Sequence, residues 1–229
     1  MKVGITLPQF RDDAETAIET AKLAEAAGLD GVFVFDHLWP IGRPDRPALH
    51  SIALLGALAV ETERVAIGTL VARVGLLPDA VLVNALVTVD RMAGGRLIAG
   101  LGVGDRLSRA ENEAFAVPFA PVPERMASLV ECCRQLRATG VTTWVGGLSE
   151  RIRRVAAAEG VALNLWGVDA DAVAAVAPAE VTWAGQVGPD VDLRAHLRAV
   201  EDAGATWAVC APVGRPWADA VKFLGEFVR

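Results

Sequence analysis

The chain has 229 residues, a formal net charge of −6 and 53% hydrophobic residues. This size and composition suit one large α/β domain or two small ones, and they argue against intrinsic disorder. The negative charge, without any basic block, makes nucleic acid and anionic membranes poor partners. No apolar run reaches the roughly 18 residues of a bilayer span. The first ten residues, MKVGITLPQF, lack the apolar core of a signal peptide, so a cytoplasmic protein is expected.

Short apolar runs alternate with helical patterns along the whole chain. The clearest unit has apolar runs over residues 65–71 and 97–101, joined by a helical pattern over 78–92 and the turn 93–96. Both runs are apolar on both faces, as in strands of a buried parallel sheet. The predicted strands are 3–7, 31–35, 65–71, 97–101, 142–145, 162–166, 181–184 and 206–210. The predicted helices are 14–27, 50–61, 78–92, 123–139, 150–159, 170–176, 191–203 and 217–228.

Eight strand–helix units in one chain predict a closed (β/α)8 TIM barrel, and residues 1–229 are expected to form this single domain. An open doubly wound sheet would need fewer strands or a second domain, and no break in composition marks one. Residues 105–121 are expected to be irregular. The three cysteines, Cys132, Cys133 and Cys210, lack the spacing of a zinc site or a disulfide framework, so they are expected to be buried small hydrophobic residues.

In a TIM barrel, ligands and chemistry lie on the loops that follow the strands. That rule selects candidate residues after each predicted strand. They are Gln9; Asp36 and His37; Thr69 and Val71; Gly102, Gly104, Asp105 and Arg106; Gly146, Gly147 and Ser149; Gly167; Gln186; and residues 212–215. No metal site is expected among them.

His37 is the most informative of these side chains, since the chain contains only three histidines. Next to Asp36, whose carboxylate could orient the imidazole or raise its pKa, His37 could act as an acid or base near neutral pH. The alternative is that Asp36 caps a loop and His37 packs against Trp39. The other two histidines, His50 and His196, fall in predicted outer helices and are expected to be structural or solvated.

Two glycine-containing turns follow predicted strands. The turn Gly146–Ser149 precedes a helix, so its backbone N–H groups could hold an anion such as phosphate; alternatively it is an ordinary tight turn with Ser149 as the N-cap. The turn Gly102-Val103-Gly104 has neither the third glycine nor the promptly following helix of a dinucleotide fingerprint. It is more consistent with clearance for a flat ligand over the barrel.

Two further patterns each allow two interpretations. Tryptophan occurs in each of the last four predicted strands, either as core filling or as the lining of a pocket for an aromatic ring. The predicted helices 50–61 and 78–92 have almost no polar face, which indicates a subunit interface or coverage by residues 105–121.

Several short motifs resemble the luciferase-like monooxygenase superfamily, especially a short member of its branch that uses the deazaflavin coenzyme F-420. These motifs are GLDG (28–31) with Asp36-His37, ETERV (61–65) with Gly68-Thr69, DRMAGGRL (90–97) with GLGVG (100–104), VPF (117–119), WVGG (144–147) and NLWG (164–167).

The resemblance implies a barrel that binds reduced F-420 or a flavin such as FMN at the strand ends. It implies hydride transfer between that cofactor and a small organic substrate, or reaction of reduced flavin with oxygen. His37 would face cofactor or substrate, a bulge at residues 69–71 would back the ring system, and Gly146 and Gly147 would lie near the phosphate. A homodimer through the second and third helices would follow.

The chain also departs from the family pattern. It lacks the usual insertions over the barrel mouth, carries Asp105 and Arg106 where an aromatic or basic residue often stands, and offers few cations there: Arg43, Arg46, Arg73, Arg106 and Arg215. Three functions stay open: an F-420- or FMN-dependent oxidoreductase, a flavin- or deazaflavin-binding protein without turnover, and a partner subunit of a heteromeric luciferase-like enzyme.

Overall fold

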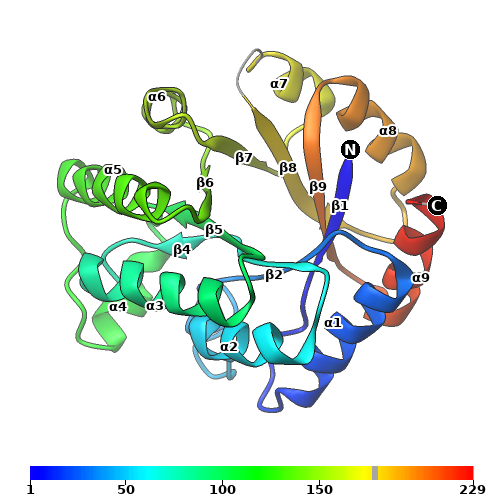
Figure 1. Cartoon of the computed structure of the whole chain (residues 1–229), viewed down its shortest axis with the longest axis horizontal. Helices are drawn as coiled ribbons and strands as arrows, with labels where there is room; N and C mark the ends of the chain where they lie inside the picture. Colours follow the sequence, from blue (N-terminus) through cyan, green and yellow to red (C-terminus); the bar gives the residue numbers. More distant parts are fainter. Residues whose placement is uncertain (177–179, 229) are drawn as a thin grey trace.

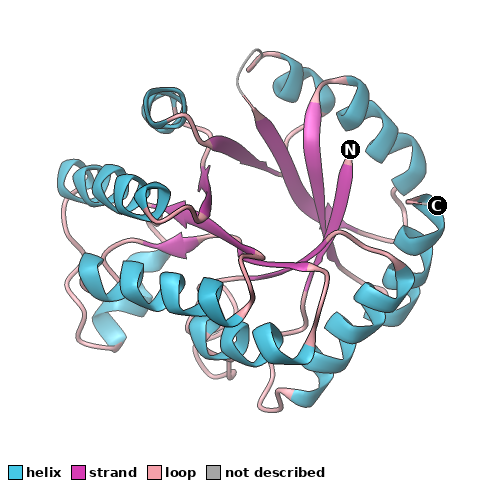
Figure 2. Cartoon of the chain, in the orientation of Figure 1, coloured by secondary structure: helices cyan, strands magenta, loops and turns pink. Residues whose placement is uncertain are grey.

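The structure is a computed structural model that describes residues 1–176 and 180–228. Its strands form one parallel sheet inside a ring of helices (Figures 1 and 2). The strands are β1 (Lys2–Thr6), β2 (Gly31–Val34), β3 (Ala66–Thr69), β4 (Ala72–Arg73), β5 (Leu97–Gly102), β6 (Thr142–Gly146), β7 (Ala162–Trp166), β8 (Val181–Val187) and β9 (Ala205–Pro212). The helices are α1 (Glu15–Ala27), α2 (Ser51–Glu61), α3 (Asp79–Met92), α4 (Ser108–Ala114), α5 (Val122–Ala138), α6 (Glu150–Glu159), α7 (Ala170–Ala174), α8 (Leu193–Asp202) and α9 (Trp217–Phe227).

The sheet closes on itself, which confirms the predicted (β/α)8 barrel. The strand order is β3-β2-β1-β9-β8-β7-β6-β5-β4, and β3 also pairs with β5 through Ile67 and Leu97. β3 and β4 are two parts of one barrel strand, because both pair with β5. They are separated by Leu70 and Val71, which are joined by a cis peptide bond. The predicted continuous strand over 65–71 therefore breaks at the position where the family resemblance implied a bulge.

Aromatic side chains fill the barrel interior. Phe33 on β2 stacks on Trp144 of β6 at 5.4 Å between ring centroids and meets Trp207 of β9 edge-on at 5.8 Å. Gly68 on β3 makes room for this cluster, since a Cβ there would lie 2.6 Å from the Phe33 ring. Trp144 and Trp207 are therefore core residues.

A second apolar layer lies between the strands and the helices. It contains Val32 and Val34 of β2 and the inward faces of the helices, with Leu55, Leu86 and Leu136 completely buried. Residues of β2 thus alternate between this layer and the interior, where Phe33 lies, as the two-residue period of a strand requires. The predicted burial of Cys132, Cys133 and Cys210 is confirmed.

Arg96 ties the C-terminal end of α2 to the start of β5. Its guanidinium donates hydrogen bonds to the carbonyls of Ala59, Thr62, Val65 and Ala93, at 2.7–3.0 Å. It also donates to the Thr62 hydroxyl at 3.0 Å. One side chain therefore satisfies carbonyls that the end of a helix leaves without intrahelical partners.

The prediction that residues 105–121 are irregular is wrong, because they contain α4. α4 is an extra short helix that lies outside the eight strand–helix units and next to the β4 end of the barrel (Figure 1). Over the described residues, no helix is both long and apolar enough to cross a membrane.

Candidate active site

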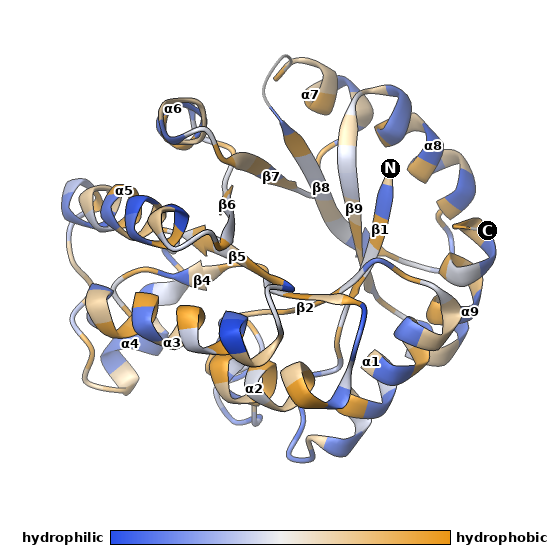
Figure 3. Ribbon diagram, in the orientation of Figure 1, coloured by the Kyte–Doolittle hydropathy of each residue, from blue (hydrophilic) through white to orange (hydrophobic). Residues whose placement is uncertain are grey.

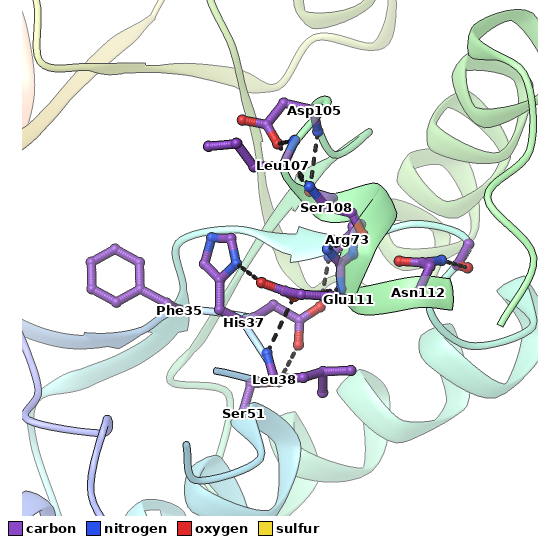
Figure 4. Close-up of polar contacts among 12 residues, drawn as sticks. Phe35, His37, Leu38, Ser51, Arg73, Asp105, Leu107, Ser108, Glu111 and Asn112 are labelled. Carbon is purple, nitrogen blue, oxygen red and sulfur yellow. Dashed lines mark hydrogen bonds and ion pairs between the residues drawn. The ribbon is translucent and has the colours of Figure 1, made fainter. Parts of the chain in front are cut away.

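The C-terminal ends of the strands bring together side chains from distant parts of the chain. His37 follows β2, Arg73 ends β4, and Glu111 lies on α4. His37 Nδ1 lies 2.7 Å from Glu111 Oε1, and Arg73 Nη2 donates to Glu111 Oε2 at 3.0 Å (Figure 4). The backbone N–H of Leu38 donates to the same Oε2 at 3.3 Å. The result is a continuous Arg73–Glu111–His37 network at the barrel mouth.

The three members of the network differ in how far their side chains are exposed to solvent. The side chains of Glu111 and Arg73 are only 2% and 4% exposed, whereas that of His37 is 24% exposed. Burial by itself would raise the pKa of the Glu111 carboxyl, but the hydrogen bond and charge of His37, the Leu38 N–H and the charge of Arg73 outweigh it and lower that pKa. Glu111 is therefore an ionised, buried acceptor, and His37 is the member that reaches the surface.

The predicted partnership between Asp36 and His37 does not occur. Asp36 Oδ1 accepts from the Ser51 hydroxyl at 2.5 Å, and Oδ2 accepts from the backbone N–H of Arg73 at 2.8 Å. Asp36 thereby joins the end of β2 to the start of α2 and to β4. The carboxylate that holds His37 is Glu111.

Gln9 and Thr69 are buried and engaged with the backbone. The Gln9 amide donates to the carbonyls of Phe35 (2.8 Å) and Leu49 (3.3 Å) and accepts from the N–H of Phe35 (2.5 Å). The Thr69 hydroxyl donates to the carbonyl of Gly100 at 2.7 Å. Both residues therefore shape the barrel mouth by fixing neighbouring strand ends.

The glycines after β5 and β6 make room for Val71. A Cβ on Gly102 would overlap Val71 Cγ2, and a Cβ on Gly146 would lie 2.8 Å from Val71 Cγ1. The clearance that the sequence pattern suggested for a flat ligand is thus occupied by a side chain from the β3–β4 break. Any ring over this part of the mouth would rest on Val71.

Gly104 begins the turn that leads into α4. It has a φ of 68°, a left-handed conformation that favours glycine, and its carbonyl accepts from Arg125 Nη1 at 2.9 Å. Arg125 also donates to the carbonyl of Val103. Burial and the nearby charges of Arg109 and Arg73 lower the pKa of Arg125. Arg106, by contrast, is exposed on the turn.

The turn after β6 has the features of an ordinary tight turn that leads into α6. The Ser149 hydroxyl accepts from the N–H of Ile152, so Ser149 is the N-cap of α6. The N–H of Gly147 donates to the carbonyl of Asn164 at 3.1 Å, which engages it within the protein. Leu148 and Ser149 are exposed at the mouth.

Aromatic rings meet across the mouth. Phe35, after β2, contacts Trp166, at the end of β7, with 5.6 Å between ring centroids, and Phe10 stacks on Phe35 at 5.9 Å. Trp166 is 38% exposed, unlike Trp144, Trp183 and Trp207. Other large apolar side chains exposed on the loops that follow the strands are Ile41, Leu107, Leu148, Val191 and Val213. The mouth is therefore an apolar rim with a few convergent polar groups, as small-molecule sites are.

Two hollows lie at the opposite, N-terminal end of the barrel. One, of about 280 Å³, is lined by residues such as Thr142, Gly160 and Glu180; the other, of about 470 Å³, is lined by residues that include Asp30 and Arg198. Neither hollow is lined by a member of the Arg73–Glu111–His37 network. Within residues 1–176 and 180–228, no cluster of His, Cys, Asp and Glu is arranged to hold a metal ion.

Glu111 is a member of the candidate site that the sequence does not reveal. It lies in SRAENEA, a polar stretch without a recognisable motif, and 74 residues separate it from His37. The sequence identifies Arg73 only as a possible cation at the mouth. A helical interpretation of residues 108–114 would have been the one available signal.

Comparison with known proteins gives the family. The luciferase-like monooxygenase family model matches residues 1–144, which is more than half of the chain. The chain belongs to this family. The matched part includes β1 to β5, α4 and every member of the Arg73–Glu111–His37 network.

Curated relatives of this family member include two enzymes named F420-dependent glucose-6-phosphate dehydrogenase (F420 is coenzyme F-420). The one from Beutenbergia cavernae is 35% identical over 125 residues, which cover 54% of this chain and 35% of that protein. The one from Rhodococcus erythropolis is 34% identical over 147 residues, which cover 64% of this chain and 42% of that protein. The chain thus matches only about a third to two-fifths of the length of these relatives.

Solved structures share the fold over the whole chain. An F420-dependent secondary alcohol dehydrogenase, solved with an F420-acetone adduct, gives a TM-score of 0.83 at 15% identity and covers 100% of this chain and 99% of its own. The coenzyme F420 dependent tetrahydromethanopterin reductase from Methanopyrus kandleri gives a TM-score of 0.77 at 13% identity. The match covers 98% of this chain and 97% of the reductase chain. At these identities the likeness establishes the barrel.

Proposed function

We propose that the chain is an oxidoreductase that transfers a hydride between F-420 and a small organic substrate at the barrel mouth, with FMN as the alternative cofactor. The observation that carries the proposal is the Arg73–Glu111–His37 network, which holds a half-buried imidazole at an apolar mouth. The names of the curated relatives support F-420 as the first cofactor to test. Three unpaired cysteines support a cytoplasmic location, where thiols stay reduced.

The residues at the mouth fit a deazaflavin or flavin ring. Val71 offers an apolar floor beside the cis peptide, and Trp166 offers an exposed aromatic face. We place the ring between residues 69–71 and the turn 102–104, where Gln9 and Thr69 act indirectly by fixing the strand ends. When bound, the cofactor supplies or accepts the hydride.

The anionic part of the cofactor would lie toward α6. Its exposed N-terminal turn, next to Gly146, Gly147 and Ser149, favours negative charge through the helix dipole. Arg106 is an exposed cation on the neighbouring loop and would approach the same part of the cofactor. Glu150 stands in the first turn of α6 and opposes an anion, so Glu150→Gln should tighten binding of F-420.

The protein's own chemical step is a proton transfer at His37. As a hydride leaves or reaches a substrate carbon, the adjoining oxygen loses or gains a proton, and an imidazole within reach can accept or donate it. His37→Ala should therefore lower turnover with little change in cofactor affinity. Asp36 would act on this step indirectly, by fixing the end of β2.

Fluorescence titration of the purified chain with F-420 and with FMN tests the cofactor. We expect F-420 to bind at tens of micromolar or tighter, and binding of neither cofactor at that level would end the proposal. Gly147→Val is a poor probe, because Gly147 has a φ of 147° and lies against Ile152, so that variant strains the turn itself. Glu150→Gln avoids this strain.

The titration, combined with an assay of substrate turnover, distinguishes the three candidate functions. Binding accompanied by substrate turnover supports the enzyme. Binding without turnover on a panel of alcohols, ketones and sugar phosphates would indicate a flavin- or deazaflavin-binding protein. Absence of binding, together with association with a second luciferase-like chain, would indicate a partner subunit.

A homodimer through α2 and α3 is part of the proposal. α2 is apolar almost all round (Figure 3), and its outward side includes Ala53 and Val60, while α3 exposes Val81. Leu54 and Leu58 of the same helix are buried against the barrel, so they are not part of the proposed interface.

The dimer is tested by light scattering at micromolar concentration. Val60→Glu should lower the measured mass to that of one chain, because an ionised carboxylate would be buried in the interface. Val191→Glu is the matched control, since Val191 is also exposed but lies on the loop after β8. A monomeric wild-type protein would contradict the dimer.

A further inference from the structure

The hydrogen bonds of Glu111 fix where the proton of His37 resides. Glu111 Oε2 accepts from two donors, the Arg73 guanidinium and the Leu38 N–H, and Oε1 is left for His37 Nδ1 at 2.7 Å. An ionised carboxylate can only accept hydrogen bonds. His37 Nδ1 must therefore carry a hydrogen, and Nε2 is the ring nitrogen that remains for other partners.

We propose that Glu111 is a positioning residue that holds His37 in the Nδ1–H tautomer, so that Nε2 is the atom that exchanges a proton at the mouth. Arg73 keeps Glu111 in place from the opposite side and neutralises its charge, with only 3.0 Å between Nη2 and Oε2. The role of Nε2 in turnover rests on the proposed function. The tautomer of His37 rests on the geometry alone.

The backbone supports the same arrangement. The residue before His37, Asp36, accepts from the N–H of Arg73 at 2.8 Å, and the residue after it, Leu38, donates to Glu111. The loop after β2 is thus held on both sides of His37 by the residues that hold its ring (Figure 4). The imidazole has little freedom to turn and exchange its two nitrogens.

Replacement of Glu111 by glutamine gives a sharp prediction. The glutamine oxygen must face Arg73 and Leu38, since both are donors, and the glutamine NH2 must then face His37. An NH2 group needs an acceptor, so His37 Nδ1 should lose its hydrogen and Nε2 should gain it. Glu111→Gln should therefore reverse the tautomer, and Glu111→Asp, which keeps the carboxylate, should preserve the Nδ1–H form.

Two-bond proton–nitrogen NMR spectra of the protein, labelled with 15N at histidine, test this directly. They are recorded at a pH where the imidazoles are neutral, and His37→Gln assigns the signals against His50 and His196. We expect wild-type His37 to be protonated on Nδ1, and Glu111→Gln to be protonated on Nε2. Glu113→Gln is the matched control, because Glu113 lies on the same helix and is exposed, so this variant should leave the His37 signals unchanged.

Two results would overturn the proposal: wild-type His37 with its hydrogen on Nε2, or a tautomer that is the same in wild type and in a folded Glu111→Gln. The wild-type spectrum decides even if Glu111→Gln fails to fold. These spectra need no cofactor, so failure of F-420 to bind leaves their outcome standing and ends only the proposed function.

Where turnover with F-420 is found, kinetics test the link to catalysis. Glu111→Gln should lower kcat about 10²- to 10⁴-fold, the usual contribution of a general acid or base, with little change in the KM for F-420. Glu111→Asp should restore part of the loss, and Glu113→Gln should keep the wild-type kcat. Equal losses in Glu111→Gln and Glu113→Gln would contradict a positioning role.

Discussion

The contact between Gly102 and Val71 predicts a specific loss of stability when Gly102 is changed to alanine. The added Cβ would overlap Val71 Cγ2, while the next atom outside Val71 is the Gly146 carbonyl oxygen at 3.9 Å. Val71 is therefore the single obstacle. Overpacking of this kind costs about 1–3 kcal/mol. The lower backbone entropy of alanine in the unfolded chain offsets about 0.5–1 kcal/mol of that cost.

A double-mutant cycle isolates this contact. In a Val71→Ala background the obstacle is gone, so Gly102→Ala should become neutral or stabilising, with a coupling energy of about 2 kcal/mol between the two sites. The coupling energy is obtained from the free energies of unfolding of the wild type, the two single variants and the double variant, measured by urea denaturation. Gly56→Ala on α2 is the control, because nothing lies within 4 Å of a Cβ there, and it should stabilise by about 0.5–1 kcal/mol. An equal cost of Gly102→Ala in both backgrounds would refute the reasoning.

Three other predictions concern buried side chains. Burial raises the pKa values of Cys132, Cys133 and Cys210 to about 12, so the native protein should not react with Ellman's reagent at pH 8, whereas the denatured chain should show all three thiols. Because its pKa is lowered on folding, ionised Glu111 stabilises the fold above the ordinary carboxyl pKa of about 4.3, and this contribution is lost as the pH falls through the lowered value. The stability gap between wild type and Glu111→Gln, from denaturation at several pH values, should therefore narrow below about pH 4; a gap that widens in acid would contradict this. Arg96→Lys should cost about 2–4 kcal/mol in the same assay, since one ammonium cannot reach the carbonyls that the guanidinium satisfies, and a loss below about 0.5 kcal/mol would contradict that role.

The barrel could be predicted because its evidence is periodic and local. Each strand is a short apolar run and each helix has its own boundary signals, such as Gly28, which ends α1 with a φ of 89°, and Asp169, which caps α7. One strand–helix pattern is weak evidence, but its eightfold repetition along the chain predicts the barrel. The same local rules placed His37 and Val71 at the mouth, because a residue after a strand must lie there.

What the sequence could not supply is which side chains meet across the mouth. Glu111 contacts His37 only when the barrel is closed. Asp36, which precedes His37 in the sequence, instead accepts hydrogen bonds from Ser51 and Arg73. The orientation of α2 could not be predicted from the sequence, for a different reason. A helix that is apolar all round has no periodic contrast, so nothing local distinguishes the buried Leu54 from an outward-facing residue.

The aromatic packing of Phe33, Trp144 and Trp207 has a kinetic consequence. These rings block the axis of the barrel, so within the described part of the chain the two ends of the barrel do not communicate through its interior. Under the proposed function, cofactor and substrate would both enter from the strand ends, and the one that lies deeper would bind first and leave last. Product inhibition patterns should consequently be those of an ordered sequence rather than of random binding.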